Sequence, residues 1–594
     1  MKQKIRFLRF VPLLAMLGAG ATPALLAQIP IAEAPTQDEQ AMSALAIDYW
    51  DAYLRNHPTY ATFAGDNRFN GNLEDLGPKA RATELAEIRE FRRRIQAIDP
   101  AGLKEENKIT PIILSQLLDF DEGISSHSFY QWRIDHIDGP QSWMIQILNF
   151  TPLKTEEDAM ALTARFKAYP YFFEQYMANL NEGLKNRRAA PRIAVERTIK
   201  QIEEMLAKTP EDSPFGLKIK TMPKELAAKH HDRAMTAVNQ TVWPSLQKFL
   251  NFLKNDYLAN SRNDDVGIGA INGGQEAYEF LIRYHTTSPH KAQELHQAGL
   301  EELNTIHQEM DALAKKLGFK GNVEQFMDKV RSDPKNFFKH REEVTASAKK
   351  NLALANAKLP QFFRTLPKTP CEVRVIEDYR EKDAPAAFYY QPDQNGKRPG
   401  IYYINTYNPA SRPRYTMTAL AVHEAMPGHH LQIALSLEAT NLPLFRRNRD
   451  FTAFTEGWGL YAERLAQDMG LYQTDMDHLG MLTYQAWRAS RLVIDTGIHA
   501  MGWSRDKAID FLKKNAPLMD EEIVNEVDRY IVWPGQALAY KVGQREILAL
   551  RAQAQQRLGE KFDLREFHDV VLRNGSIPLP MLRQMVEDWL KSKV

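Results

Sequence analysis

Residues 423–432 hold the side chains best suited to chemistry, in the order His-Glu-Ala-Met-Pro-Gly-His-His-Leu-Gln. A His followed directly by Glu, with a second His one or two helical turns later, is a zinc-binding pattern. In it the Glu, here Glu424, stays free as a general base. The common spacing of the two ligands is four residues, because these positions share one helix face. That position is Pro427, so the second ligand must be His429 or His430.

Both later imidazoles lie too far from His423 if the helix is unbroken, at roughly 9 Å for His429 and 10.5 Å for His430 along its axis. Pro427 has no N–H for the carbonyl of residue 423, and its ring crowds that carbonyl. Gly428 can adopt backbone dihedrals that other residues avoid. We therefore expect an interruption of the helix that returns one imidazole to the metal. A chance occurrence of the pattern is the alternative.

A third protein ligand is needed, with a further position left for water or substrate. Residues 451–463 read Phe-Thr-Ala-Phe-Thr-Glu-Gly-Trp-Gly-Leu-Tyr-Ala-Glu and follow a loop over residues 441–450. An antiparallel helix after this loop would bring Glu456 back to the first helix. Glu463, seven residues later, shares the same helix face. It is either a hydrogen-bond partner of a ligand His or an exposed surface charge.

The pattern resembles the gluzincin metallopeptidases, which combine His-Glu-x-Gly-His with a Glu ligand on a later helix. In its longer form it is similar to the bacterial family of domain of unknown function 885. This similarity rests on residues 423–432, on Thr-Glu-Gly-Trp at 455–458 and on Trp-Pro-Gly-Gln-Ala-Leu-Ala-Tyr-Lys at 533–541. It extends over roughly residues 40–590. The resemblance implies a mainly α, large helical fold with a deep channel, as in thimet oligopeptidase and angiotensin-converting enzyme.

The resemblance also implies one Zn²⁺ ion held by His423, His429 and Glu456. His429 is favoured because it follows a glycine, as in the shorter gluzincin motif. Two extra residues precede this glycine here, so His430 stays the rival ligand. Glu424 would take the proton of a zinc-activated water and pass it to the leaving amine.

The oxyanion formed during amide hydrolysis needs a second donor besides the metal. Related peptidases use a Tyr or His from a C-terminal helix, which suggests Tyr540 or His499 here, with Tyr530 as a weaker candidate. For each of them, a role as a buried aromatic or core residue is an equally good interpretation.

Two further features suggest substrate contacts. Arg488 and Arg491, beside Trp487, would suit a substrate carboxylate, or they pair with an acidic neighbour such as Asp495. The segment 401–407 is either an ordinary core strand or an exposed sheet edge that pairs with an extended peptide.

The rest of the sequence supplies the elements that must position these residues. Most of it has helical periodicity. We predict an N-terminal helical lobe over residues 36–265 and a catalytic helical lobe over 266–594, with the Gly- and Asn-containing segment 263–274 at the boundary. Residues 371–409 depart from the helical pattern. Their alternation and their Tyr and Ile content predict a small β-hairpin or sheet before the zinc helix.

Residues 1–27 have the character of a secretory signal peptide, with four positive charges before an apolar run at residues 10–17. That run is too short to span a membrane. Its removal changes the formal net charge from +1 to −3, which argues against a nucleic-acid surface. Cys371 is the one cysteine, so no intramolecular disulfide can form and no lipid-attachment Cys follows the signal. We expect a periplasmic or secreted protein, with an N-terminal membrane anchor as the alternative.

Together these features predict an exported zinc metallopeptidase that hydrolyses peptides or small unfolded substrates. No nucleic-acid partner and no stable membrane insertion after signal removal are expected. Two alternatives stay open. One is a zinc amidohydrolase for a non-peptide amide, and the other is a non-catalytic peptide-binding protein derived from a peptidase.

Overall fold

The computed structural model describes residues 35–378, 381–382, 384–393, 396 and 398–593. The predicted signal peptide, residues 1–27, lies outside this part of the chain. None of the helices in the described part is both long enough and apolar enough to cross a membrane.

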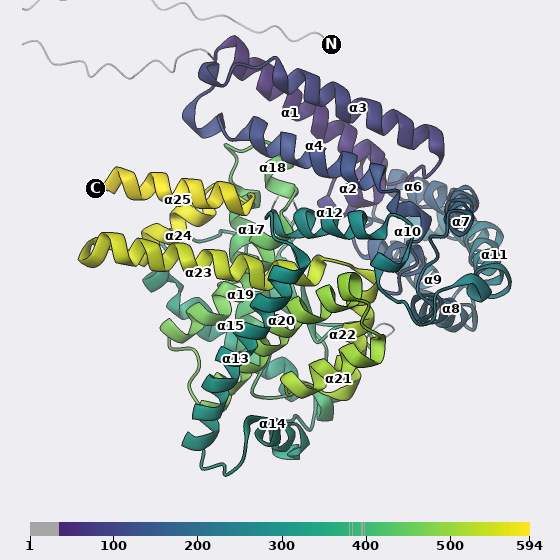
Figure 1. Cartoon of the computed structure of the whole chain (residues 1–594). Coiled ribbons are helices and arrows are strands. Elements are labelled where there is room, and N and C mark those ends of the chain that lie inside the picture. Colours follow the sequence, from purple (N-terminus) through teal and green to yellow (C-terminus); the bar gives the residue numbers. More distant parts are fainter. Residues whose placement is uncertain (1–34, 379–380, 383, 394–395, 397, 594) are drawn as a thin grey trace, which may run out of the picture.

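Helices dominate the described residues, which confirms the predicted mainly α class. The first part of the chain forms α1 (Gln37–Asn56), α2 (Pro58–Ala64), α3 (Pro78–Gln96), α4 (Thr110–Ser126), α5 (Pro140–Gln146), α6 (Glu156–Lys167), α7 (Tyr169–Lys185), α8 (Arg192–Leu206), α9 (Pro214–Ile219), α10 (Lys224–Ala237) and α11 (Trp243–Phe252). Of these, α1, α3 and α4 pack side by side at the top of Figure 1, and α6 to α11 gather at its right.

The second part carries the predicted site. Its helices are α12 (Gly274–Thr286), α13 (Ala292–Lys316), α14 (Val323–Ser332), α15 (Arg341–Phe362), α16 (Met417–Glu424), α17 (His429–Glu438), α18 (Leu444–Asn448), α19 (Thr452–Asp468), α20 (Asp475–Met501), α21 (Arg505–Asn515), α22 (Asp520–Val532), α23 (Ala539–Leu558), α24 (Leu564–Leu572) and α25 (Leu579–Lys593). The long helix α20 packs along α13, and α19 packs along α23.

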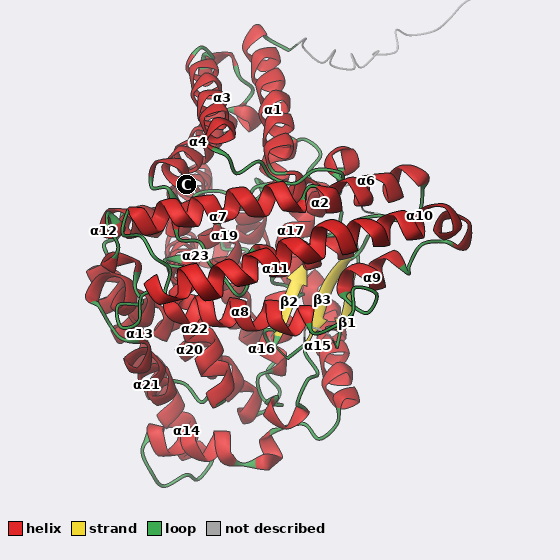
Figure 2. Ribbon diagram, turned by 90° about the vertical axis from the view of Figure 1, so that its right-hand side faces the viewer, coloured by secondary structure: helices red, strands yellow, loops and turns green. Residues whose placement is uncertain are grey.

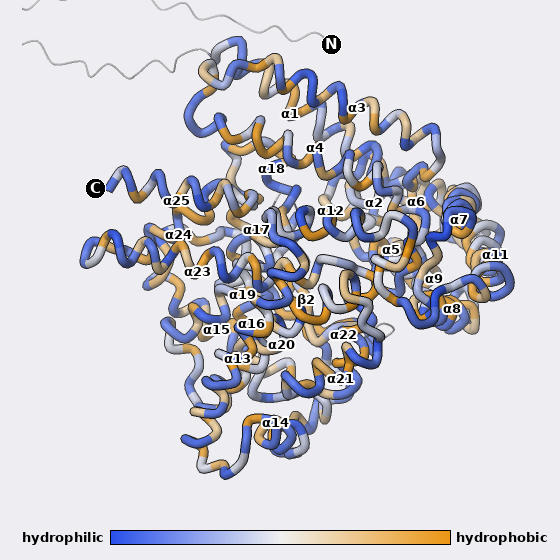
Figure 3. The backbone as a smooth tube through the Cα atoms, in the orientation of Figure 1, coloured by the Kyte–Doolittle hydropathy of each residue, from blue (hydrophilic) through white to orange (hydrophobic). Residues whose placement is uncertain are grey.

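The buried apolar residues form two large clusters. One lies between residues 134 and 257. The other combines residues 42–120 with residues 266–590, so helices from both ends of the chain share one core. Hydrophobic and hydrophilic residues alternate along α1 and α3 in Figure 3, as expected for helices with one buried face. The predicted lobe boundary near residue 265 stays a prediction.

The predicted small sheet is present. It consists of β1 (Cys371–Val375), β2 (Ala387–Tyr390) and β3 (Gly400–Ile404). The central strand is β3, which runs parallel to β1 and antiparallel to β2, and all its residues are buried. The suggestion that the strand at 401–407 offers an exposed edge to a peptide is therefore wrong. The strand beside α16 is the edge strand β2, and Figure 2 shows the sheet next to α15 and α16.

The helix α19, which carries Glu456, is positioned by a close crossing with α23. A Cβ on Gly543 of α23 would lie 1.8 Å from the carbonyl oxygen of Ala453 on α19. A Cβ on Gly457 would likewise lie 2.5 Å from the Cα of Gly543. Because neither helix carries a side chain at the crossing, α19 lies directly against α23, the helix of Tyr540.

Candidate metal centre

The helical backbone is interrupted where the Pro-Gly pair predicts it. α16 ends at Glu424, and α17 begins at His429 after a turn that contains the cis Met426–Pro427 peptide bond. The turn is short, since the N–H of His430 donates to the carbonyl of Ala425 at 3.1 Å. The two candidate imidazoles therefore belong to the first turn of a new helix and do not continue α16.

Gly428 lets this turn pack against α16. A Cβ at this position would lie 2.0 Å from the carbonyl oxygen of His423, which is too close for any other residue. Trp458 of α19 stabilises the turn through a hydrogen bond, in which its Nε1 donates to the carbonyl of Pro427 at 2.8 Å. The start of α17 is thus held beside the last turn of α16.

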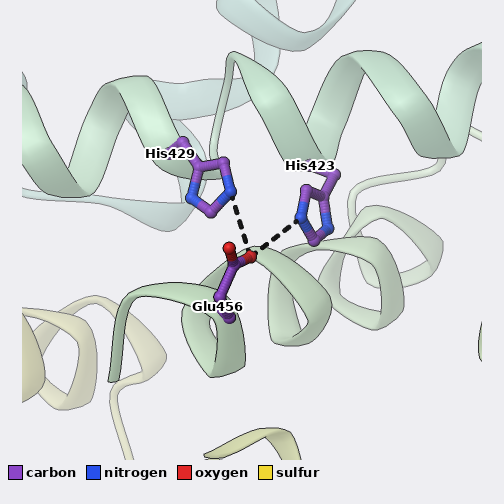
Figure 4. A group of neighbouring side chains, drawn as sticks. All are labelled: His423, His429 and Glu456. Carbon is purple, nitrogen blue, oxygen red and sulfur yellow. Dashed lines mark ion pairs between the residues drawn. The ribbon is translucent and has the colours of Figure 1, made fainter. Parts of the chain in front are cut away.

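The imidazoles of His423 and His429 and the carboxylate of Glu456 converge on one point, as Figure 4 shows. Oε2 of Glu456 lies 3.5 Å from Nε2 of His423 and 3.3 Å from Nε2 of His429. One possible ligand atom from each of the three residues lies within 4.8 Å of the others. The structure therefore brings together the three residues that the sequence predicts as ligands. We call His423, His429 and Glu456 the group.

The arrangement fits a metal ion. In a tetrahedral site with zinc–ligand bonds of about 2.0–2.2 Å, neighbouring ligand atoms are about 3.3 Å apart. Oε2 of Glu456 is buried and has no hydrogen-bond partner within the described part of the chain, although two ring nitrogens are near it. Lone pairs that meet at this distance without a hydrogen bond suit a shared cation. Two imidazoles and a carboxylate suit zinc better than Mg²⁺ or Ca²⁺, which prefer oxygen ligands.

Glu463 is the hydrogen-bond partner of a ligand and not a surface charge. Its side chain is fully buried, and its Oε1 lies 2.8 Å from Nδ1 of His423. Burial favours the neutral imidazole, but the carboxylates of Glu456 and Glu463 outweigh it and raise the pKa of His423 to about 9. Nδ1 of His429, by contrast, has no hydrogen-bond partner among the residues described.

His430 is excluded from the group by its own hydrogen bonds. Its Nδ1 lies 2.9 Å from the hydroxyl of Tyr389 on β2, and its Nε2 lies 2.9 Å from the carbonyl oxygen of Thr369. Burial lowers the pKa of His430 to about 4. Both ring nitrogens are occupied away from Glu456, so the geometry selects His429 over His430.

Glu424, the predicted general base, is the last residue of α16 and directly follows His423. Its side chain is half-buried and forms no hydrogen bond with the described residues. The carboxylate is therefore adjacent to the group without being one of the three converging side chains.

Tyr540 lies against the group. Its ring stacks on the imidazole of His423 with centroids 6.2 Å apart and planes at 18°. Its hydroxyl oxygen accepts hydrogen bonds from Nη2 of Arg529 at 3.0 Å and from Nε2 of Gln536 at 3.4 Å. The hydroxyl proton therefore stays available for another acceptor.

His499 is placed differently. Its Nδ1 accepts a hydrogen bond from the N–H of Ile268 at 3.0 Å, and its Nε2 donates to the carbonyl of Tyr530 at 2.9 Å. Burial lowers its pKa to about 3. These are the contacts of a neutral core histidine, so the geometry does not support the predicted role of His499 as an oxyanion donor.

The predicted pairing of the α20 arginines with Asp495 is wrong. Arg491 donates from Nη2 to Oε2 of Glu526 at 2.9 Å and from Nε to the hydroxyl of Tyr530 at 3.0 Å. Asp495 instead accepts hydrogen bonds from Tyr278 and from the main chain of residue 535. The hydroxyl oxygen of Tyr530 accepts hydrogen bonds from Arg491 and Trp487, and no contact in the described part of the chain places Tyr530 against His423, His429 or Glu456.

Arg529 is a residue near the group that the sequence reasoning missed. It lies on α22, and its Nη2 reaches the hydroxyl of Tyr540. The one local signal was the spacing of Glu526 and Arg529, which are neighbours on one helix face. That spacing is common on exposed helices and does not by itself indicate a site.

A family model described as bacterial protein of unknown function (DUF885) matches residues 58–586. The chain belongs to this family. The match includes every residue of the group and its neighbours on α16, α17, α19 and α23. Among curated proteins, no sequence matches the chain.

Two solved bacterial structures are similar to this one. The first is described as a putative lipoprotein from Colwellia psychrerythraea, with a TM-score of 0.88 and 28% sequence identity over 94% of this chain and 100% of that chain. The second is described as a putative lipoprotein of unknown function from Shewanella oneidensis, with a TM-score of 0.70 and 20% identity over 92% of this chain and 99% of that one. The second likeness concerns the fold alone.

Proposed function

We propose that the chain is an exported zinc-dependent peptidase that hydrolyses peptides or small unfolded substrates. The observation that carries this proposal is the convergence of His423, His429 and Glu456 at distances suited to zinc ligands, with Glu424 next to His423 and without a hydrogen bond from its side chain to the described residues. The likeness of the motif to gluzincin peptidases supports the same reaction. A deep substrate channel of the kind those enzymes have is part of the proposal.

The residues around the group have separate tasks in this mechanism. His423, His429 and Glu456 would hold the zinc ion, which would supply Lewis acidity for the scissile carbonyl and a lowered pKa for a water molecule. Glu424 accepts the proton of that water and passes it to the leaving amine. Glu463 accepts the Nδ1 proton of His423, which leaves the Nε2 lone pair for the metal.

Tyr540 is the proposed second stabiliser of the oxyanion. Its hydroxyl oxygen already accepts from Arg529 and Gln536, so its proton points away from these donors toward a further acceptor. The positive charge of Arg529 makes the phenol a stronger donor. Such a donor stabilises negative charge that develops on the carbonyl oxygen.

The export part of the proposal combines two observations. Residues 1–27 have the charge and hydropathy of a signal peptide. The similar structure from Colwellia psychrerythraea is described as a putative lipoprotein. Because the one cysteine of this chain is Cys371, far from the signal, we propose export to the periplasm or the medium without lipid attached to a cysteine.

The variant Glu424→Gln tests the function. It should bind about one zinc per chain, as the unmodified protein does, and lose peptide hydrolysis by about 100-fold or more, because general base catalysis is removed. Elemental analysis measures the metal, and mass spectrometry of a mixed-peptide digest measures cleavage. The matched control is Glu301→Gln on the exposed face of α13, which should change neither.

Three outcomes would contradict the proposal. The first is protein without bound zinc even after incubation with the metal. The second is full peptide cleavage by zinc-loaded Glu424→Gln. The third is cleavage of non-peptide amides alone, which would indicate an amidohydrolase.

A further inference from the structure

Two buried arginines and one partly exposed arginine lie beside the proposed metal centre. Arg491 of α20 lies with its Cζ 4.4 Å from the ring centroid of Tyr540. Arg529 of α22 donates to the hydroxyl of the same Tyr540. Because that ring stacks on His423, one aromatic side chain separates both guanidinium groups from a ligand of the metal. Arg488 lies one helical turn before Arg491. We call Arg488, Arg491 and Arg529 the arginine cluster.

The arginine cluster has fewer anionic partners than cations. The carboxylate of Glu526 forms ion pairs with two guanidinium groups. Its Oε2 lies 2.9 Å from Nη2 of Arg491, and its Oε1 lies 3.5 Å from Nη1 of Arg529. The acidic group nearest to Arg488 is Glu463, at 3.7 Å from its Nη2. That carboxylate already binds His423 at 2.8 Å. Two carboxylates, one of them shared with an imidazole, therefore face three permanent positive charges.

One more carboxyl group lies near the arginine cluster. Burial raises the pKa of Glu522 to about 7, so this group carries only part of a negative charge at neutral pH. The partial negative charge of Glu522 does not neutralise the remaining positive charge of the three arginines. The cluster therefore keeps an excess of positive charge in the interior, where an unmatched charge is costly and an added anion is stabilising.

Several N–H groups of the arginine cluster also lack a hydrogen-bond acceptor among the described residues. Nη1 of Arg491 and both Nε and Nη1 of Arg488 are buried without a hydrogen-bond partner among the described residues. The two residues are only 2% and 4% exposed. Arg529 provides the access, because 18% of its side chain remains exposed to solvent. Charged N–H groups beside an accessible guanidinium fit a carboxylate, which guanidinium groups bind through paired hydrogen bonds.

We infer that Arg491 and Arg529 bind the C-terminal carboxylate of the substrate peptide, so that cleavage takes place close to the free C-terminus. The same positive charge repels a peptide N-terminal ammonium group from this position. This inference rests on the proposed peptidase function and specifies its substrate class, peptides with an unblocked C-terminus. Arg488 orients the site through its contact with Glu463.

Matched peptides test the inference without any substitution. One peptide sequence is offered to the zinc-loaded mature chain as the free acid, as the C-terminal amide and as the N-acetylated free acid. We expect amidation to lower kcat/KM by about 100-fold, because a charge-assisted hydrogen bond pair is lost. Acetylation of the N-terminus should change kcat/KM by less than about threefold, since no residue of the cluster contacts that end.

Substitution of Arg529 locates the effect. Arg529→Gln should remove most of the roughly 100-fold difference in kcat/KM between the free acid and the amide, beyond the fall that both substrates share when the contact with Tyr540 is lost, and Arg529→Lys should restore part of the preference. The control is Arg583→Gln on α25, whose side chain pairs with Glu546 at the surface. Binding supplies a readout besides activity. The inactive Glu424→Gln protein should bind the free acid about 100-fold more tightly than the amide by calorimetry, and should lose this preference when Arg529→Gln is added.

The outcomes separate this inference from the proposed function. Equal cleavage and equal binding of acid and amide would overturn the carboxylate site while the peptidase function stands. Absence of peptide cleavage by zinc-loaded protein would overturn the function, and the calorimetric preference would then decide the carboxylate site by itself. If Arg529→Gln fails to fold, the comparison of acid and amide on the unmodified chain still decides.

Discussion

At the scale of single residues, His429 and His430 show how strongly the environment sets the chemistry of identical side chains. The imidazole of His429 faces Glu456 and His423. Both ring nitrogens of His430 instead form hydrogen bonds, with the hydroxyl of Tyr389 and the carbonyl oxygen of Thr369. Consecutive helix positions differ by about 100° around the axis, so neighbouring side chains enter different surroundings. The first therefore suits a metal ion, and the second suits a structural contact with β2.

This difference predicts opposite results for two alanine variants. His429→Ala should weaken zinc binding by more than about 100-fold, because a direct ligand is lost. His430→Ala should keep about one zinc per chain and lower the free energy of unfolding by about 1–3 kcal/mol, because buried hydrogen bonds are removed. A chelator competition and a thermal unfolding series measure the two effects. Loss of zinc in His430→Ala alone would reverse the assignment of the second ligand.

At the scale of elements, the site depends on a helix that stops and restarts. α16 supplies His423, and α17 supplies His429 from its first turn. The turn between them is held at both sides, since Gly428 packs on the carbonyl of His423 and Trp458 binds the carbonyl of Pro427. Because Trp458 and Glu456 both belong to α19, the same helix fixes the turn and supplies the third side chain.

Gly428→Ala tests this arrangement. The added Cβ, 2.0 Å from the carbonyl oxygen of His423, must push α17 away from α16. We expect zinc affinity to fall by about 10-fold or more and the free energy of unfolding to fall by about 1–3 kcal/mol, as for overpacked interiors. The control is Gly71→Ala, where the nearest atom to the new Cβ lies at an ordinary 3.6 Å. Unchanged zinc binding in Gly428→Ala would show that the close packing is not needed.

At the scale of the whole molecule, α20 connects the site to distant parts of the chain. All its residues from 479 to 499 are buried. Its Asp495 accepts a hydrogen bond of 2.6 Å from the hydroxyl of Tyr278 on α12, and two of 3.1 Å from the N–H of Gly535 just before α23. One buried carboxyl thus joins the helices that carry the arginine cluster and Tyr540.

Asp495 also gives the fold a defined pH dependence. Burial raises its pKa to about 7, and this outweighs the donors Tyr278 and Gly535, which lower it. In the unfolded chain the pKa is about 3.9. Between about pH 4 and pH 7 the folded carboxyl holds a proton that the unfolded chain has lost. The contribution of Asp495 to stability is therefore full at low pH and decreases as the pH rises through this window.

The variant Asp495→Asn cannot titrate and should lack this decrease. Relative to the variant, the unmodified protein should lose up to about 4 kcal/mol of unfolding free energy between pH 4 and pH 7. Denaturant unfolding of both proteins across this range measures the difference. Asp510→Asn, on the exposed side of α21, is the control and should run parallel to the unmodified protein. Parallel curves for Asp495→Asn would contradict the assigned pKa.

The sequence by itself determined the features that depend on local backbone chemistry. Helical periodicity predicted the mainly α class, and alternation between residues 371 and 409 predicted the sheet. The Pro-Gly pair predicted the break after α16, since proline cannot continue the hydrogen bonds of the helix and glycine admits close backbone contact. The spacing after that break singled out Glu456, because a loop followed by an antiparallel helix returns its side chain to the same place.

The tertiary structure alone decided between residues that are chemically equivalent in the sequence. It selected His429 over His430, placed Tyr540 and not His499 beside the group, and replaced Asp495 by Glu526 as the partner of Arg491. It also brought in Arg529, whose spacing from Glu526 does not by itself indicate a site. The physical reason is that each choice depends on burial and on partners distant in the sequence. Local spacing fixes which face a side chain occupies, but only packing fixes what that face meets.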